Sequence, residues 1–309
     1  MSERYDVAII GAGPAGLQAA IHAARRKMRT VLLGKIEKSA LYKAHLENYF
    51  GVPGKIEGRE ILEIGLKQAQ SFGAFHLPLD VVRVETQGDH FLIELENGEV
   101  LSSYTVLFAT GVSRRKGRLL KGEKELLGKG VSYCVDCDGF FFRGLPVAVI
   151  GDESAAVHGA LTLSKITRPV YLISQGLKVS PALQGQLEES GVEIILGRPV
   201  EILGEAEVEG LRLEDGRVLE VKGVFIEQGA KGAMQLAATL GVALDPQNMT
   251  YIQVDRQQRT NLPGVFAAGD VCGPPLQVAK AVGEGCVAGL AAAEEAARRR
   301  REASREDTD

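Results

Sequence analysis

Residues 5–16 read YDVAIIGAGPAG, an apolar run followed at once by three closely spaced glycines. The run Tyr5–Ile10 is typical of a parallel strand buried on both faces. Pro14 suits the first turn of a helix, and Thr30–Leu33 (TVLL) predicts the next strand. Strand, glycine loop, helix and strand form the context that a dinucleotide-binding loop requires. The loop that we expect to hold a pyrophosphate at the helix N-terminus comprises Gly11, Gly13, Pro14, Ala15 and Gly16.

The length and charge of the chain limit the classes of protein to which it can belong. A chain of 309 residues predicts about two domains of ~150 residues each. The net charge of −4 and the pI of about 5.9 give no basic signature for nucleic acid. No apolar run approaches the ~18 residues of a membrane helix. The N-terminus reaches its first strand without the pattern of a signal peptide, so we expect no membrane partner and a cytoplasmic location.

The opening pattern returns in the middle of the chain. An apolar strand at Pro146–Ile150 leads into the loop Gly151–Ala156 and a helix at Ser154–Lys165, and Val170–Ile173 follows as a strand. The repeat indicates a second nucleotide-type fold. The sequence therefore predicts an α/β protein with two Rossmann-like domains, each built of three layers.

Between the two glycine loops lies a cysteine pair, Cys134-Val-Asp-Cys137. In a reducing compartment such a pair is catalytic or metal-binding more often than structural. Two cysteines at this spacing can close a small disulfide ring. Asp138 follows at once, and a carboxyl group there can pass a proton to or from a thiol. The alternative, half of a zinc site, needs two more ligands, and the other cysteines and histidines show no second paired spacing.

These motifs together identify a family. The segment Gly130–Gly139 (GVSYCVDCDG), the first glycine loop, Ala109-Thr110-Gly111 and Val265–Asp270 (VFAAGD) are the strongest matches. The chain resembles the low-molecular-weight thioredoxin reductases nearly from end to end. The resemblance implies an FAD domain built from residues 1–114 and 245–309. It also implies an inserted smaller, nucleotide-binding-like domain, residues 115–244, that carries the cysteine pair.

The resemblance implies roles for single residues. Reduced flavin passes electrons to the disulfide, Cys137 faces the flavin, Cys134 attacks the disulfide of the partner, and Asp138 is the acid. The partner is thioredoxin or a thioredoxin-like protein, and the family is commonly homodimeric. Glu37 is the nearest candidate for the acid that binds the FAD ribose; a solvated loop glutamate is the alternative. The remaining expected FAD contacts are Asn48, Ala109, Thr110, Gly111, Gly269, Asp270, Gln277 and Val278, besides the first glycine loop.

The chain departs from the family where NADPH binds. The second loop has Glu153 in place of its middle glycine, which adds bulk and negative charge. Ser174–Gly176 replaces a His-Arg-Arg cluster, and Glu227–Lys231 replaces Gly-His-x-Pro-Asn. A hydrogen bond to a charged group is worth ~1.5–3 kcal/mol. The loss of two arginine contacts therefore weakens the binding of NADPH about 10²- to 10⁴-fold.

NADPH is accordingly a doubtful donor. In these departures the chain resembles members that take electrons from ferredoxin or from another flavin. We expect one FAD, and a second flavin in the inserted domain stays open. Two alternatives also stay open: an NADPH-dependent reductase with a divergent site that uses Lys178 or Arg198, and a non-catalytic or oxidase-type redox sensor. Cys272, close to the expected flavin, is either structural or a redox or gating residue.

Overall fold

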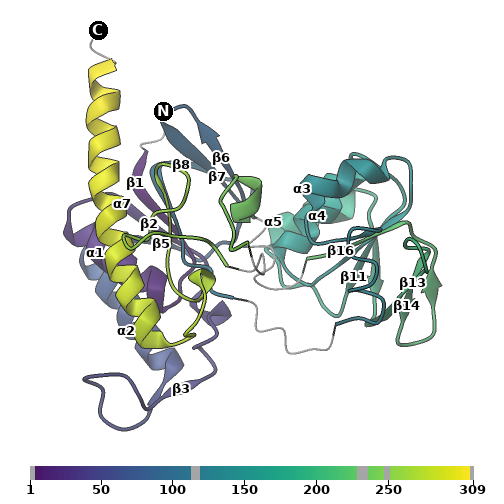
Figure 1. Cartoon of the computed structure of the whole chain (residues 1–309), viewed down its shortest axis with the longest axis horizontal. Helices are drawn as coiled ribbons and strands as arrows, with labels where there is room; N and C mark the ends of the chain where they lie inside the picture. Colours follow the sequence, from purple (N-terminus) through teal and green to yellow (C-terminus); the bar gives the residue numbers. More distant parts are fainter. Residues whose placement is uncertain (1–3, 113–118, 228–235, 247–250, 307–309) are drawn as a thin grey trace. The chain divides into compact units, whose positions relative to one another are not determined.

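The computed structural model describes residues 4–112, 119–227, 236–246 and 251–306 (Figure 1). The chain divides into two compact units. Unit 1 comprises Met1–Leu95, Glu99–Val112 and Leu236–Asp309, and unit 2 comprises Glu96–Gly98 and Ser113–Gln235. The predicted start of the inserted domain, at residue 115, and the predicted exit motif beyond Glu227 lie outside the described residues.

Unit 1 is built on a seven-stranded sheet of order β5-β2-β1-β8-β7-β6, with β17 paired to β8. Pairs β1–β2, β2–β5, β1–β8 and β8–β17 are parallel, and the hairpin strands β6 and β7 are antiparallel. The last five residues of β1 are buried, as the apolar run predicts. The strands are β1 Tyr5–Ile10, β2 Thr30–Leu33, β5 Phe75–Leu77, β6 Val81–Gln87, β7 His90–Leu95, β8 Val100–Phe108 and β17 Val265–Ala267. A separate ribbon pairs β3 His45–Leu46 with β4 Ile56–Glu57.

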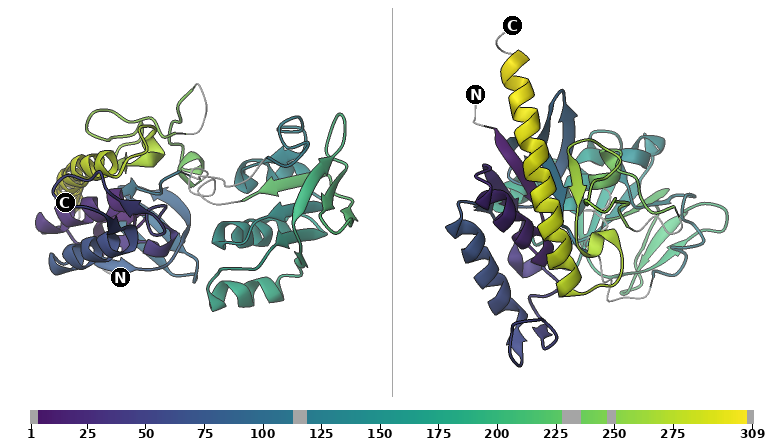
Figure 2. Two further views of the ribbon diagram at one scale, coloured as in Figure 1. Left: turned by 90° about the horizontal axis from the view of Figure 1, so that it is seen from below. Right: turned by 60° about the vertical axis from the view of Figure 1, so that its left-hand side comes forward.

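Three long helices belong to unit 1: α1 Pro14–Arg25, α2 Gly58–Ser71 and α7 Val278–Glu306. Helices α1 and α7 lie side by side (Figure 2). Glycines make this approach possible, because a Cβ added to Gly289 would lie 2.7 Å from the Cα atom of Ala19. Two short 3₁₀ helices complete the unit, η1 Ile36–Lys38 and η3 Asp270–Cys272.

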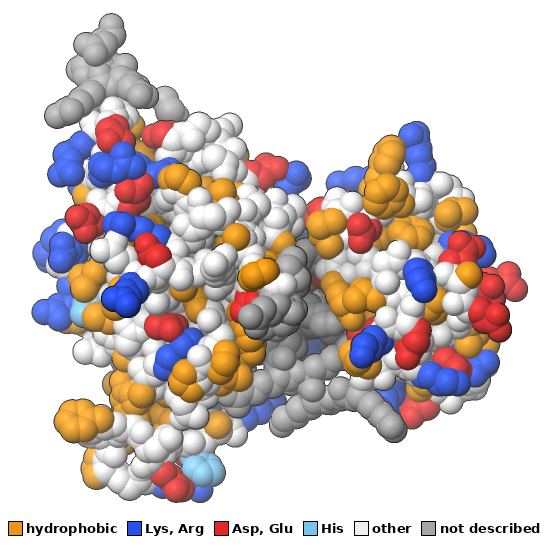
Figure 3. All heavy atoms as spheres, in the orientation of Figure 1, with side chains coloured by type: hydrophobic (Ala, Val, Ile, Leu, Met, Phe, Trp, Pro, Cys, Tyr) orange, Lys and Arg blue, Asp and Glu red, His pale blue; other side chains and the backbone are white. Residues whose placement is uncertain are grey.

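Charges of both signs are interspersed along α7 (Figure 3). Arg298 and Arg299 both bind Glu295 within the helix. Arg300 reaches the buried carboxylate of Asp6, at 3.1 Å. The arginines near the end of α7 thus hold the helix and the start of β1 together.

Unit 2 has three layers around a five-stranded parallel sheet of order β12-β11-β10-β16-β9. Val147 and Val149 of β10 pack toward α4 and α5, whereas Ala148 and Ile150 pack toward a small antiparallel sheet. The parallel strands are β9 Val131–Ser132, β10 Val147–Ile150, β11 Val170–Ser174, β12 Glu193–Leu196 and β16 Gly223–Ile226. The small sheet contains β13 Pro199–Leu203, β14 Gly210–Leu213 and β15 Val218–Leu219. The helices are α3 Val135–Asp138, η2 Gly139–Phe142, α4 Ser154–Ser164 and α5 Pro181–Glu189.

The architecture confirms the predicted fold class, although the ends of some elements differ from those that the sequence suggests. The alanine-rich segment Pro275–Arg301 predicts a long last helix, whereas α7 begins at Val278 and reaches Glu306. The amide of Gln277 bonds to the carbonyl of Pro275, which makes a turn before the helix. The first α-helical bond then runs from Ala281 to Gln277. Among the described residues, no helix combines the length and the apolar character that crossing a membrane demands.

Candidate functional site

Three neighbouring parallel strands of unit 1 end at one edge of the sheet. Strands β1, β8 and β17 run directly into the first glycine loop, Ala109–Gly111 and Gly269–Asp270. Because the carboxyl ends of parallel strands meet, residues far apart in the sequence come together here. The approach is tight: a Cβ added to Gly269 would lie 2.8 Å from that of Ala15. Most of the residues expected to bind FAD therefore lie at this one edge.

The first glycine loop has the features of a phosphate site. The N-cap of α1 is Gly13, with no side-chain cap and no acidic residue in the first turn. A Cβ added there would meet only Ser39 Oγ, at 3.5 Å, so the space beside the loop is open. Such a terminus presents unpaired amides and a partial positive charge. It suits the pyrophosphate of FAD.

A second observation points to a ligand at the same edge. The hydroxyl oxygen of Thr110 is buried and has no hydrogen-bond partner among the described residues. A buried hydroxyl without a partner is destabilising, and native structures rarely leave one. A polar ligand atom at this place would supply the partner. The residues of unit 1 therefore fit FAD.

The other residues expected to contact FAD, which do not follow these three strands directly, form two groups. Asn48 donates its amide to Gln277 Oε1 at 3.2 Å, so residues from two distant segments meet. Val278 is the first residue of α7 and thus adjoins this pair. Glu37 lies in η1 shortly after β2, and its side chain is exposed. Its exposure is compatible both with a ribose contact and with a solvated glutamate.

Two residues near the FAD edge were missed by sequence reasoning. Lys280 and Glu284 of α7 hold the turn at Gly269–Gly273 through the contacts described below. Their spacing of four residues is typical of an ion pair on a helix. That signal does not reveal that a distant turn is bound as well.

Cys272 lies in the same turn. Burial, with the negative charge of Glu284 second, raises the pKa of the Cys272 thiol to about 12. The thiol is therefore neutral at physiological pH and a poor nucleophile. This favours the structural interpretation of Cys272. Cys286 follows Gly285 on an apolar face of the last helix, which predicts a core position, but it is only half-buried on α7.

The redox pair lies on a one-turn helix in unit 2. Cys134 is the N-cap of α3 and forms a disulfide with Cys137, with 5.3 Å between their Cα atoms. The amide of Cys137 donates to Cys134 Sγ at 3.1 Å. Val135 is buried against Gly159 of α4, which anchors the turn. Cys137 is exposed and Cys134 is half-buried.

Asp138 is joined to the redox pair by a hydroxyl group. Ser132 Oγ donates to Asp138 Oδ2 at 2.6 Å and accepts the amide of Cys134 at 2.9 Å. The three predicted catalytic residues are thus gathered on one turn. Ser132 was missed by sequence reasoning, because a serine before a cysteine pair carries no signal of its own.

The second glycine loop is bound to its own unit. Asp152 Oδ1 accepts the hydroxyl of Ser174 and the amide of Gln175, both at 2.8 Å. At the start of α4, Ser154 donates to the buried carboxylate of Glu96 at 2.6 Å. Both contacts place carboxylates beside the second glycine loop and the first turn of α4. This loop therefore does not share the open character of the first loop.

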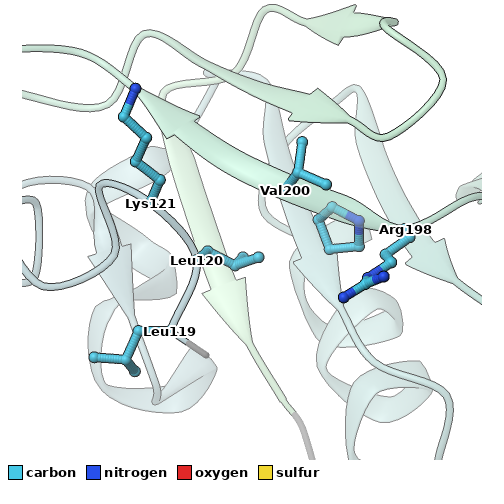
Figure 4. A pocket seen from close by; sticks show the side chains of 6 residues that line it. Leu119, Leu120, Lys121, Arg198 and Val200 are labelled. Carbon is cyan, nitrogen blue, oxygen red and sulfur yellow. The ribbon is translucent and has the colours of Figure 1, made fainter. Parts of the chain in front are cut away.

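One pocket of about 460 Å³ lies elsewhere in unit 2 (Figure 4). Its lining includes the cations Lys121 and Arg198, which pair with Glu201 and Glu214. No residue of the redox pair or of the second glycine loop lines it. Among the described residues, no three His, Cys, Asp or Glu side chains gather in a way that could hold a metal ion.

Comparison with known proteins gives a consistent result. The model of the pyridine nucleotide-disulphide oxidoreductase family matches residues 5–285. The thioredoxin reductase of Aquifex aeolicus (strain VF5) is 38% identical over 299 residues, which cover 93% of this chain and 92% of that protein.

Two solved structures are also similar. The atypical thioredoxin reductase TRi from Desulfovibrio vulgaris Hildenborough has 38% identity and a TM-score of 0.86, and the match covers 96% of this chain and 99% of that one. A ferredoxin-flavin thioredoxin reductase from Clostridium acetobutylicum has 32% identity and a TM-score of 0.69, with coverage of 94% and 98%.

The chain therefore belongs to the pyridine nucleotide-disulphide oxidoreductase family, and within it to the low-molecular-weight thioredoxin reductases. It is an enzyme, a flavin-dependent disulfide oxidoreductase of the thioredoxin reductase type.

Proposed function

We propose that this enzyme reduces the disulfide of thioredoxin or a thioredoxin-like protein through Cys134 and Cys137, with electrons from a donor other than NADPH. Ferredoxin or another flavin is the proposed donor. The observation that carries this proposal is the contrast between the two glycine loops. Both loops precede a helix without a side-chain cap, but the first loop is open beside Gly13, whereas the second is bound through Asp152 to the end of β11.

FAD, when bound to unit 1, supplies the two electrons that open the disulfide. The thiolate of Cys134 then attacks the disulfide of the partner, forms a mixed disulfide and releases one thiolate of the partner. The thiolate of Cys137 next attacks Cys134 Sγ, which restores the Cys134–Cys137 disulfide and releases the second thiolate. Two electrons have passed to the partner, whose thiolates take up two protons.

Asp138 is the proposed proton carrier. Its carboxylate is held by Ser132 on the turn that carries both sulfurs. A carboxyl group at this position can protonate the Cys137 thiolate and receive its proton back. Cys137 is exposed, which leaves it free to approach a flavin, and Cys134 then faces the partner.

The residues around the second glycine loop support a donor other than NADPH. Asp152 occupies the end of β11, where a dinucleotide would place its ribose or 2′-phosphate, and Glu153 stands at the N-cap of α4. Phosphate groups close to these carboxylates would be repelled. No arginine follows β11 before Arg198, which pairs with Glu214. A protein donor needs only access to the flavin edge, and a neighbouring structure is of a ferredoxin-flavin thioredoxin reductase.

The surface beside the redox pair suits a protein substrate. Phe140 and Phe141 directly follow the α3 turn and are 68% and 76% exposed, and Leu145 is 41% exposed. Figure 3 shows hydrophobic side chains at the surface of unit 2, the unit that carries α3. An exposed aromatic pair next to a reactive disulfide favours docking of a folded partner. We also propose that the enzyme is a homodimer and acts in the cytoplasm, where a cycling dithiol is kept reducible.

Trapping the partner tests the proposed roles of the two cysteines. Cys137→Ser, reduced and mixed with oxidised thioredoxin, should accumulate a mixed disulfide through Cys134, because the resolving thiol is gone. Cys134→Ser should not form this adduct. Peptide mapping by mass spectrometry identifies the linked cysteine, and the flavin count per chain is measured on the same samples. An adduct through Cys137 alone would reverse the roles. The absence of thioredoxin reduction with every donor would favour a redox sensor.

A further inference from the structure

The turn Gly269–Gly273 contains Asp270, which is expected to contact FAD. Two backbone bonds of its own, from Cys272 to Gly269 and from Gly273 to Asp270, shape it into η3. Gly269 and Gly273 have φ values of +88° and +102°, a region that favours glycine. Both residues lack side chains that could hold the turn in place. Contacts from other elements add further restraint to these two internal bonds.

Lys280 of α7 supplies much of that restraint. Its ammonium group donates to the carbonyl of Gly269 at 2.8 Å and to that of Gly273 at 2.7 Å. It also lies 3.0 Å from Glu284 Oε2. An ammonium group has three donors, and these contacts use all three. One side chain thus bridges both ends of the turn.

Glu284 completes the arrangement. Its Oε2 accepts the amide of Gly269 at 2.8 Å, so that both the N–H and the C=O of Gly269 are held. The side chains of Lys280 and Glu284 are 16% and 22% exposed, which limits screening by water. Neither residue belongs to the expected FAD contacts.

We propose that Lys280 and Glu284 act together as positioning residues that hold the Gly269–Gly273 turn in the conformation that binds FAD. Neither side chain need touch the cofactor. A preformed turn does not have to be ordered when FAD binds, so the pair strengthens binding by reducing that entropic loss. Cys272, which is half-buried and whose thiol is neutral, lies in the same turn. The inference rests on FAD binding in unit 1 and is independent of the electron donor.

The experiment measures FAD binding to apoprotein through flavin fluorescence. Lys280→Met and Glu284→Gln should each weaken binding about 10- to 100-fold, since each leaves the other group without its partner. The double variant should be no weaker than the worse single variant, because the pair acts as a unit. Lys280→Arg, which keeps the charge, should recover part of the affinity.

Matched controls lie on the same helix. Arg298 and Glu302 have the same order and spacing, but their side chains are 49% and 53% exposed and bind no turn. Arg298→Met should leave the FAD Kd within twofold of wild type. Melting temperatures of the apo and holo protein distinguish a positioning role of the pair from a purely structural one. If the pair positions the turn, its loss reduces the stabilisation that FAD adds. If its role is purely structural, the melting temperatures of both forms fall equally.

Unchanged FAD affinity in Lys280→Met and Glu284→Gln, or an equal loss in Arg298→Met, would overturn the proposal. If Lys280→Met does not fold, the conservative Glu284→Gln decides the question by the same measurement. A failure of thioredoxin reduction, by contrast, would leave the FAD affinities untouched and would bear only on the proposed function.

Discussion

At the scale of single residues, one hydroxyl group joins the proposed acid to the redox pair. Ser132 contacts both the carboxylate of Asp138 and the amide of Cys134. It can therefore fix the acid relative to both sulfurs while taking no part in electron transfer. The motif predicted Cys134, Cys137 and Asp138 because they are adjacent in sequence. Ser132 could not be predicted, since its role depends on the path of the turn.

Ser132→Ala should slow thiol exchange about tenfold. Proton transfer by a positioned group accelerates a reaction ~10²- to 10⁴-fold, and a misplaced Asp138 carboxyl group would lose part of that acceleration. Ser132→Thr keeps the hydroxyl and should retain most of the rate. Single-turnover reduction of thioredoxin by pre-reduced enzyme measures the step. Ser164→Ala is the control, since Ser164 binds only the carbonyl of Leu161 on α4. Equal rates in Ser132→Ala and wild type would rule out a positioning role.

The thiol of Cys272 gives a prediction about pH. Burial raises its pKa to about 12, so the fraction of reactive thiolate should rise about tenfold per pH unit through pH 10. Iodoacetamide labelling of oxidised Cys286→Ala protein, followed by mass spectrometry, isolates Cys272. Because the pKa of this thiol is higher in the folded than in the unfolded chain, its contribution to the free energy of unfolding is fully present below the unfolded pKa of about 9. That contribution is lost as the pH rises toward 12. A labelling rate that levels off below pH 9 would contradict the account.

At the scale of elements, the hydrophobic pattern predicts strands and helices better than their ends. The regular apolar spacing of Arg59–Phe72 predicts a helix there, and α2 lies at Gly58–Ser71. The apolar residues of Val208–Leu213 predict a strand, but β14 begins at Gly210. Val208 is buried, but its amide bonds to Lys129, outside the ladder. A sequence pattern reveals burial, whereas the hydrogen-bond partner depends on tertiary structure.

Helix α7 allows a matched test of packing. A Cβ on Gly289 would meet the backbone of Ala19 in α1, whereas one on Gly283 would have no heavy atom within 4 Å. Gly289→Ala should lower the free energy of unfolding by about 1–3 kcal/mol through overpacking. Gly283→Ala should raise it by up to ~1 kcal/mol, because alanine favours a helix. Urea unfolding of both variants measures the difference, and equal effects would show that the two helices do not need close contact.

At the scale of the whole molecule, the chain contains the strand–loop–helix motif twice, and the residues of the two glycine loops differ in their contacts. In unit 1 the loop is open beside Thr110, whose buried hydroxyl has no described partner. In unit 2 the corresponding loop is bound through Asp152, and Glu153 is the N-cap of the helix that follows. The departures from the family pattern were visible in the sequence. The internal contacts of Asp152 were not, because they require the ends of β10 and β11 to lie side by side.

The central claim is that electrons enter through the flavin without NADPH. The most direct measurement is anaerobic stopped-flow absorbance of the FAD-loaded enzyme, mixed in turn with NADPH, NADH and reduced ferredoxin. The account predicts rapid bleaching of the flavin band by reduced ferredoxin and little bleaching by either nicotinamide at micromolar concentration. Rapid bleaching by micromolar NADPH would contradict it and would establish an NADPH-dependent thioredoxin reductase with a divergent site.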